Sequence, residues 1–341
     1  MKTQRIGKMK RCLFVCLFAV FQCFAQESKI EGETIQFTSD HVRLSGQLFM
    51  PPGDSPFPAV VILQGGSSNV KAQRSTSEYY ANRFAKKGIA ALMYDKRGTG
   101  DSGGEFRTST FDDLVMDAIN AVRFLKEQAK INPQKIGIFG PSQGGRIAAL
   151  AAARSPDIAF IATLSTPLVP VADLCYFSSM DFLKRMGITD SVKSLVDPLW
   201  KKHYEYVESG SVQGLKELDL QIDAFYQKVD TLFLPLTSDK LDHLNDFQLG
   251  DFQPMYNSME RDYISELSKI HVPWLNIYAE FDSAVPVEAS AKIMKEQMAT
   301  GGQTDYEIKI IPGVNHGFRN VETNEYVRVE DIAIDWVLTK M

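Results

Sequence analysis

One serine occupies a pattern that can make it a nucleophile. Residues 140–144 read Gly-Pro-Ser-Gln-Gly, with Ser142 at the centre. Apolar residues precede this turn at 136, 138 and 139, and small and apolar residues recur at helical spacing after it, which predicts a strand, a sharp turn and a helix. The two glycines let the strand and the helix approach closely, so that the serine hydroxyl projects above the sheet. The alternative is an ordinary glycine-rich turn with an exposed serine.

A nucleophilic serine requires a base within hydrogen-bond reach, and the base requires an orienting carboxylate. His316 is the candidate base, because it lies at 311–318, in the loop after the last expected core strand. A loop histidine that only packs on its neighbours is the alternative. The remaining histidines lie in the opening hairpin, in the central helical segment or ahead of a strand, and fit less well: His41, His203, His243 and His271.

The candidate carboxylate is Asp282, which follows the preceding expected strand in the segment 279–286. Glu280 is its rival. Asp282 lies deeper in the loop, and the Val-Pro pair after it marks the turn toward the next helix, so we favour Asp282. Asp95 ends another expected strand, and we interpret it as a structural residue that fixes the following Lys-Arg-Gly turn through local hydrogen bonds.

Acyl transfer from such a serine also builds an oxyanion, which needs two hydrogen-bond donors. The backbone N–H of Gln143, directly after the serine, is the first candidate. The second should come from the loop after the apolar strand, where Gln64-Gly65-Gly66 lets bare backbone approach a substrate carbonyl. We choose Gly66, uncertain by one residue, and an ordinary strand-end turn is the alternative. The scattered histidines and cysteines indicate no metal site, and no cofactor is expected.

Alternating strands and helices must position these residues, which is typical of a mostly parallel sheet covered on both faces. An antiparallel hairpin at 34–38 and 42–50 opens the expected eight-stranded sheet. The other expected strands lie at 56–66, from 88 onward, ahead of the Ser142 turn, at 160–166, at 272–282 and at 306–311, and the main helices at 76–87, 111–128, 287–298 and 327–339.

The alternation stops at about residue 168, where helical segments with many large apolar residues take over. We expect a helical cap at 168–268, inserted into a core made of 26–167 and 269–341. The aromatic and methionine side chains of this segment either line an apolar substrate pocket or form the cap's own small core.

The first 25 residues are typical of a secretory signal peptide, because basic residues precede a short apolar run and small Ala25 marks a plausible cleavage point. The alternative is a lipoprotein anchored through Cys23, which Phe21 and Gln22 disfavour. Five basic residues would leave with this segment, which takes the formal net charge from −5 to −10. Three of the four cysteines would leave as well, and only Cys175 would remain. The expectation is a periplasmic or secreted protein without membrane insertion and without nucleic-acid partners.

The Gly-Pro-Ser-Gln-Gly turn, the Asp282 and His316 loops and the Asp-Lys-Arg-Gly-Thr-Gly-Asp-Ser-Gly-Gly segment at 95–104 together resemble the α/β-hydrolase superfamily. Within it they look most like secreted bacterial serine hydrolases near the prolyl-oligopeptidase-like, serine-aminopeptidase-like and bile-acid acyltransferase or thioesterase-like enzymes. The resemblance implies that Ser142 is the nucleophile, Asp282 the acid and His316 the base. This chain departs from many relatives by having Gln64, where they have histidine before the glycine.

Hydrolysis of carboxylic esters is the first functional expectation, because an aromatic cap suits an apolar acyl group. An exopeptidase is the second, and would need a cap carboxylate such as Glu205 or Glu208 to hold a substrate ammonium. An acyl thioesterase on the same three residues and a non-catalytic binding protein on a hydrolase scaffold are the others. The expected partner is therefore a small ester, a thioester or a short peptide.

Overall fold

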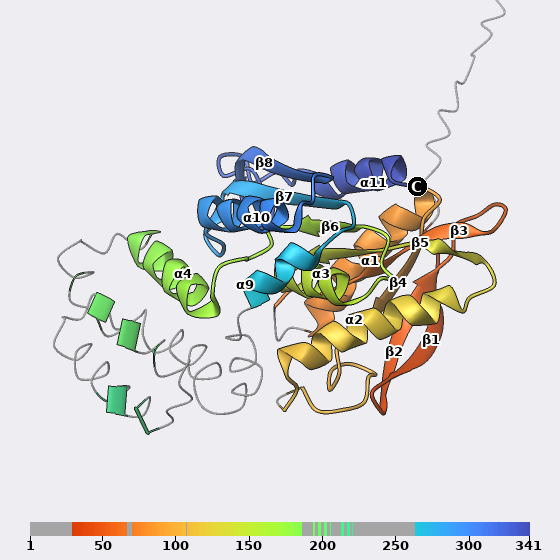
Figure 1. Ribbon diagram of the computed structural model, residues 1–341, viewed down its shortest axis with the longest axis horizontal. Helices are drawn as coiled ribbons and strands as arrows, with labels where there is room; N and C mark the ends of the chain where they lie inside the picture. The colour runs from red at the N-terminus through yellow and green to blue at the C-terminus, as the bar shows by residue number, and fades with distance from the viewer. Residues whose placement is uncertain are drawn as a thin grey trace, which may run out of the picture.

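The computed structural model describes residues 29–66, 70–106, 108–185 and 263–341, together with scattered positions between 194 and 220. One eight-stranded sheet, in the order β1-β2-β4-β3-β5-β6-β7-β8, runs through the core (Figure 1). Its strands are β1 (Glu33–Ser39), β2 (Val42–Phe49), β3 (Phe57–Ile62), β4 (Ala90–Tyr94), β5 (Ile131–Pro141), β6 (Ile161–Leu164), β7 (Trp274–Phe281) and β8 (Tyr306–Asn315).

Among the eight strands of this sheet, only β2 runs against the direction of the others. β1 pairs with β2 in antiparallel register, and β2 pairs in the same way with β4, whereas every later pairing is parallel. Asp40 and His41 connect β1 to β2 with φ angles of 43° and 71°, the left-handed backbone that a two-residue hairpin needs. The predicted mostly parallel, eight-stranded sheet is confirmed.

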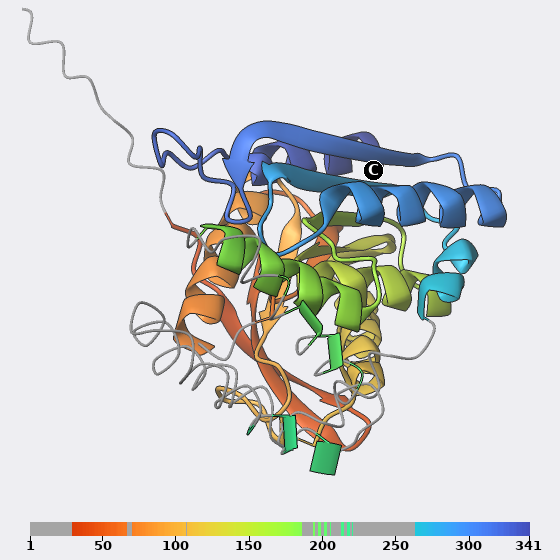
Figure 2. The same cartoon turned by 90° about the vertical axis from the view of Figure 1, so that its left-hand side faces the viewer.

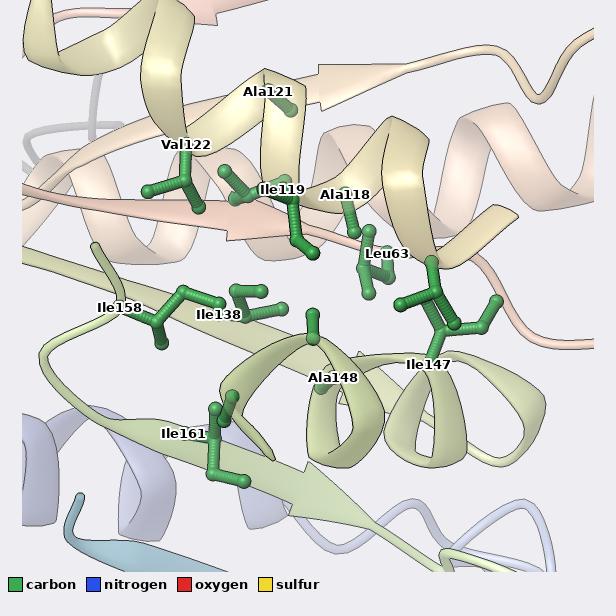
Figure 3. Packing of buried hydrophobic residues seen from close by; sticks show 14 of the residues in the cluster. Leu63, Ala118, Ile119, Ala121, Val122, Ile138, Ile147, Ala148, Ile158 and Ile161 are labelled. Atoms are coloured by element: carbon green, nitrogen blue, oxygen red, sulfur yellow. The ribbon is translucent and has the colours of Figure 1, made fainter. Parts of the chain in front are cut away.

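Helices cover both faces of this sheet, as predicted. α1 (Val70–Lys86) and α11 (Val329–Thr339) contribute to the apolar cluster on one face. α2 (Phe111–Lys126), α3 (Gln143–Arg154) and α10 (Val287–Gly301) contribute to the cluster on the other. Figure 3 shows this second cluster, in which Ile119 and Val122 of α2 and Ala148 of α3 gather around Ile138 of β5. The central strands are therefore buried on both faces, which explains their continuous apolar runs.

The helix ahead of the Ser142 strand begins at a strong local signal. The Thr110 hydroxyl accepts a hydrogen bond from the Asp113 N–H at 3.1 Å, and the Thr110 N–H donates to the Asp113 carboxylate at 2.7 Å. This capping box satisfies two N–H groups that a helix start would leave unpaired. The predicted helix 111–128 accordingly begins at Phe111 and ends two residues early, at Lys126.

Several element boundaries differ from the sequence-based expectation, and three of them show why. α1 begins at Val70 instead of residue 76, because its first turns are exposed and carry no apolar period that could have marked them. β5 begins at Ile131, where it pairs with Phe57 beyond a bulge, and β8 continues to Asn315, where it pairs with Phe281 beyond another. Pairing with a neighbouring strand, which a single sequence does not display, sets these strand ends.

The predicted cap lies mostly outside the described residues, and so do the predicted signal peptide at 1–25 and Cys23. The segment begins with α4 (Val171–Arg185), the bright green helix that faces the viewer in Figure 2. Its Leu174 packs against the buried cluster of Tyr278, Val285 and Ala291. It ends with α9 (Tyr263–Glu266) and η1 (Leu267–Lys269), which pack on α3 and α10. No helix in the described ranges is long and apolar enough to cross a membrane.

Candidate active site

Ser142 stands alone between a strand and a helix. β5 ends at Pro141 and α3 begins at Gln143, and Ser142 between them has φ 52° and ψ −119°. A non-glycine residue at such angles costs about 1–3 kcal/mol and persists only where its surroundings impose it. Here the Ser142 N–H donates to the Leu164 carbonyl of β6 at 2.7 Å, and the Ser142 side chain makes no capping hydrogen bond to α3. The Ser142 hydroxyl therefore does not cap the helix that follows it.

The glycines beside this turn are required by close approach. A Cβ atom at Gly140 would lie 2.4 Å from the Gly144 carbonyl oxygen, and one at Gly144 would lie 2.8 Å from the Gln64 carbonyl oxygen. Both neighbours are backbone atoms, so a side chain at either position would force the chain apart. The geometry explains why both positions of the Gly-x-Ser-x-Gly pattern hold glycine.

A buried carboxylate follows β7 and binds the ring of His316. Asp282 has a fully buried side chain, and its Oδ1 and Oδ2 atoms lie 2.9 Å and 2.8 Å from His316 Nδ1. Oδ1 also accepts hydrogen bonds from the N–H groups of Ala284 and Val285, both at 2.9 Å. These donors compensate for taking a negative charge out of water. When Nδ1–H of a neutral His316 ring donates its hydrogen bond to Asp282, the Nε2 atom is left as an acceptor.

His316 reaches this position from a tight turn after β8. The Phe318 N–H donates to the Asn315 carbonyl at 2.7 Å, and the Asn315 side chain accepts from the N–H groups of Gly317 and Arg319. Phe318 is buried and has a φ of 53°, which anchors the turn to the core. The His316 side chain remains 32% exposed, so the ring is open to a reactant at one side while Asp282 holds it from the other.

The rival carboxylate serves a different contact. The exposed Glu280 accepts a hydrogen bond from the Gly313 N–H at 2.8 Å, which ties β7 to β8. Among the described residues, the structure thus brings Asp282 and His316 into direct contact and leaves Glu280 on the backbone of β8. Asp95 lies elsewhere: its Oδ2 accepts from the Asp101 N–H at 3.0 Å, which fixes the turn after β4 as expected.

Ser142 lies at the same edge of the sheet as this pair. β5, β6, β7 and β8 are parallel neighbours, so the turns that follow them all leave from their carboxyl ends. Neighbouring strands lie about 5 Å apart, which sets Pro141 at the end of β5 about 10 Å from Ile277 of β7, four residues ahead of the end of β7 at Phe281. The loops that carry Asp282 and His316 therefore leave from the same edge of the sheet as the Ser142 turn.

The loop after β3 lies against the Ser142 turn, as the oxyanion-hole hypothesis requires. A Cβ atom at Gly65 would lie 3.8 Å from Ser142 Cβ, and one at Gly66 would lie 3.6 Å from Gln143 Cβ. Gly65 is buried and Gly66 is exposed. The Gln143 N–H belongs to the first turn of α3, where the helix dipole favours negative charge. Both candidate donor segments thus meet beside the serine.

Sequence reasoning missed one residue of this region, Lys96. Its side chain is buried, and its Nζ donates to the Gly65 carbonyl and to the Gln143 side-chain oxygen, both at 2.7 Å. Burial lowers the pKa of Lys96 to about 7. In sequence Lys96 lies two residues after the apolar strand at 90–94, and this position does not distinguish a buried lysine from one that reaches water.

Two further expectations concern residues outside this cluster. Glu205, one of the two carboxylates considered for a substrate ammonium, is exposed, and Glu208 lies outside the described residues. In the described part of the chain, no three His, Cys, Asp or Glu side chains come together as metal ligands would.

Comparison with known proteins gives several matches. The model of the family described as Serine aminopeptidase, S33 matches residues 54–323. Esterase EstD of Thermotoga maritima is 23% identical over 279 residues, which cover 80% of this chain and 57% of that protein. Thiohydrolase aneE of Aspergillus aculeatus is 32% identical over 123 residues, which cover 36% of this chain and 37% of that protein. This chain therefore spans less than two thirds of either relative.

Solved structures agree on the fold. The α/β hydrolase GrgF from a Penicillium species matches with a TM-score of 0.59 and 20% identity, over 92% of this chain and 99% of that one. The family model covers most of the chain, including the Ser142 turn, Asp282 and His316. With the eight-stranded, mostly parallel sheet, these matches show that the chain belongs to the serine aminopeptidase S33 family of α/β hydrolases.

Proposed function

We propose that this protein is a serine hydrolase that cleaves carboxylic esters through an acyl-enzyme on Ser142. The contact between buried Asp282 and half-exposed His316, at the sheet edge where Ser142 is held in a strained turn, carries this proposal. A serine, a carboxylate and a histidine in this chain order can perform nucleophilic acyl transfer, since the carboxylate holds the imidazole in the tautomer that accepts a proton.

In the first half of the reaction, His316 Nε2 takes the proton of Ser142 as its hydroxyl oxygen attacks the substrate carbonyl. Asp282 stabilises the imidazolium that forms, and the N–H groups of Gln143 and Gly66 bind the oxyanion. His316 then gives its proton to the leaving alcohol, and the acyl group remains on Ser142. In the second half, His316 deprotonates a water molecule as it attacks the acyl-enzyme, and then returns this proton to Ser142 Oγ as the acid leaves.

The start of the predicted cap supports a pocket for an apolar acyl or alkyl group. Leu174 of α4 packs against the buried cluster of Tyr278, Val285 and Ala291. Val285 lies three residues beyond Asp282, so α4 begins near the loop that carries the candidate acid. The remainder of the cap at 168–268 belongs to the proposal. An apolar pocket with few polar groups suits the acyl part of an ester more than a charged peptide end.

Aminopeptidase action is the second candidate, and the description of the matching family favours it. This activity would need a carboxylate that holds the substrate ammonium. Glu205 is exposed to water, which does not favour that role. Cleavage of thioesters would use the same groups, and the name of the Aspergillus relative points to it. The ester proposal therefore predicts a preference for an alcohol leaving group and for an apolar acyl chain.

Rates on graded substrates test this proposal. Purified protein is assayed on acyl esters and acyl thioesters of two to twelve carbons and on aminoacyl anilides, beside Ser142→Ala. We expect Ser142-dependent turnover that is fastest on esters. Faster turnover of anilides than of esters would establish the peptidase instead, and turnover that survives Ser142→Ala would remove Ser142 as the nucleophile.

We also propose that residues 1–25 are a signal peptide and that the mature protein is periplasmic or secreted. The basic start followed by a short apolar run supports this. Sequencing the N-terminus of protein recovered from cells that express the full chain tests it. A protein that begins near Gln26 is the expected result, whereas a retained leader or a lipid on Cys23 would contradict it.

A further inference from the structure

Lys96 is buried where no charge compensates it. Its Nζ lies 2.7 Å from two neutral acceptors, the Gly65 carbonyl and the Gln143 side-chain oxygen. No carboxylate forms an ion pair with it in the described part of the chain. The flanking charged residues are engaged elsewhere: Arg97 binds Asp113 and Asp117, and Asp95 binds the Asp101 N–H. Burying an ammonium in this way is costly.

The surroundings of the Lys96 side chain are mostly apolar. It lines a small cavity with Leu63, Gln64, Tyr94, Leu114 and Ile147. Tyr94 is the titratable group among them, and burial raises its pKa well above the ordinary value, so it stays neutral. The uncharged Gln73 of α1 donates a hydrogen bond to the Gly65 carbonyl, which Lys96 also contacts. Burial with no charged partner lowers the pKa of Lys96 to about 7, and perturbed groups of this kind concentrate at functional sites.

The first Lys96 contact acts on the peptide that carries the second oxyanion donor. The Gly65 carbonyl and the Gly66 N–H belong to one planar peptide group, so fixing the oxygen fixes the direction of the N–H. Lys96 holds that oxygen at 2.7 Å, and Gln73 Nε2 donates to it at 3.3 Å. A donor on the carbonyl also polarises the peptide and strengthens its N–H as a donor.

The second Lys96 contact reaches the residue that carries the first donor. The Gln143 side-chain oxygen accepts from Nζ, and the Gln143 N–H is the other proposed oxyanion donor. One ammonium group therefore bridges the loop after β3 and the first residue of α3.

We propose that Lys96 is a positioning residue that holds the Gly65–Gly66 peptide and Gln143 at the spacing required for a two-donor oxyanion hole. This inference rests on the proposed function. Lys96 does not touch the reacting atoms; it acts through the two groups that would. Such positioning affects the transition state more than the bound substrate, because the charge it serves appears only during reaction.

Replacing Lys96 with methionine tests this role, because methionine fills similar space and donates no hydrogen bond. We expect Lys96→Met to lower kcat on the best ester by about 10- to 100-fold while KM changes less than about threefold. Lys96→Arg keeps the charge and the donors and should recover part of kcat. The matched control is Lys126→Met, which removes an exposed lysine that pairs with Asp157 at the end of α2, and which should leave kcat unchanged.

A pH series separates positioning from packing. The quantity measured is the ratio of wild-type kcat to Lys96→Met kcat at each pH, which reports the contribution of Lys96. The ammonium polarises the Gly65 carbonyl more than the neutral amine does, so this ratio should fall as the pH rises through about 7. A ratio that is constant between pH 5.5 and 8.5 would contradict the proposal.

Labelling of Ser142 by a fluorophosphonate distinguishes the two possible failures. If the wild type shows no Ser142-dependent label, the proposed function itself fails. If the label forms but folded Lys96→Met has the wild-type kcat, or loses only KM, the role of Lys96 is overturned. Should Lys96→Met not fold, Gln73→Leu removes the other hydrogen bond to the Gly65 carbonyl; a lower kcat at unchanged KM supports the proposal, and a wild-type kcat overturns it.

Discussion

Two of the buried carboxylates in the described part of the chain, Asp282 and Glu330, have partners that differ in kind. Asp282 binds the ring of His316, which is 32% exposed and leaves its second ring nitrogen open to a reactant. Glu330 of α11 is fully buried and accepts hydrogen bonds from the hydroxyl groups of Tyr79 and of Tyr326, the latter at 2.7 Å. Burial raises the pKa of both tyrosines, so neither hydroxyl gives up its proton at ordinary pH.

The difference lies in what the neighbours of each carboxylate can do. Arg83 of α1 lies 4.0 Å from Glu330 and also binds Asp331, so this cluster fastens α1 to α11 on one face of the sheet. The raised pKa values of Tyr79, Tyr326 and Arg83 keep these donors protonated, so the cluster serves the fold. The Asp282 pair lies at the carboxyl edge of the sheet, with the His316 ring partly exposed. Burial of a charge alone does not mark a catalytic site; a buried charge that steadies an accessible base does.

The largest effect should come from Asp282→Asn. The amide cannot stabilise the imidazolium and favours the wrong tautomer of His316, so kcat should fall by about 10³- to 10⁴-fold. The free energy of unfolding should change much less than the activation free energy, since asparagine keeps an oxygen for the Ala284 and Val285 N–H groups. Ester hydrolysis and urea denaturation of the same preparation measure both quantities. A variant that unfolds yet keeps full kcat when folded would reverse the comparison.

Glu330→Gln should show the opposite pattern. It removes a charged acceptor from two buried hydroxyl groups, and we expect the free energy of unfolding to fall by about 1–3 kcal/mol. Because the cluster lies away from the site, kcat per folded molecule should equal that of the wild type. Denaturation curves with active-site titration measure this. A loss of kcat comparable to that of Asp282→Asn would show that the two carboxylates are not separate in role.

The smallest effect should come from Glu280→Gln, the matched control for Asp282→Asn on the same strand end. The amide oxygen can still accept from the Gly313 N–H, and the side chain is exposed. The activation free energy calculated from kcat and the free energy of unfolding should both stay within about 0.5 kcal/mol of the wild type. A loss of activity here, with activity retained in Asp282→Asn, would make Glu280 the acid.

The sequence predicted the parts of the molecule whose signals are local. The turn at Ser142 could be found because its glycines and its flanking strand and helix are contiguous. The Asp282 and His316 loops follow apolar strands in the same way. The ends of β5 and β8 could not be found, because Ile131 and Asn315 join the sheet through pairing with distant residues.

Lys96 and Glu330 escaped for the same reason. In sequence, Lys96 is one basic residue in a glycine-rich turn, and nothing nearby indicates that it is buried against Gly65 and Gln143. Glu330 begins an ordinary helix, and its partner Tyr79 is 251 residues away. Burial of a charge is a tertiary property, so residues that owe their role to it are visible only in the structure.

We propose that Ser142 is a nucleophile, that His316 activates it and that Asp282 orients His316. The most direct test of this proposal is to treat the protein with a fluorophosphonate, digest it and locate the phosphonate by tandem mass spectrometry. We expect one adduct, on Ser142. It should form much more slowly in Asp282→Asn and should be absent in Ser142→Ala. The absence of an adduct, or an adduct on another residue that forms as fast in Ser142→Ala as in the wild type, would contradict it.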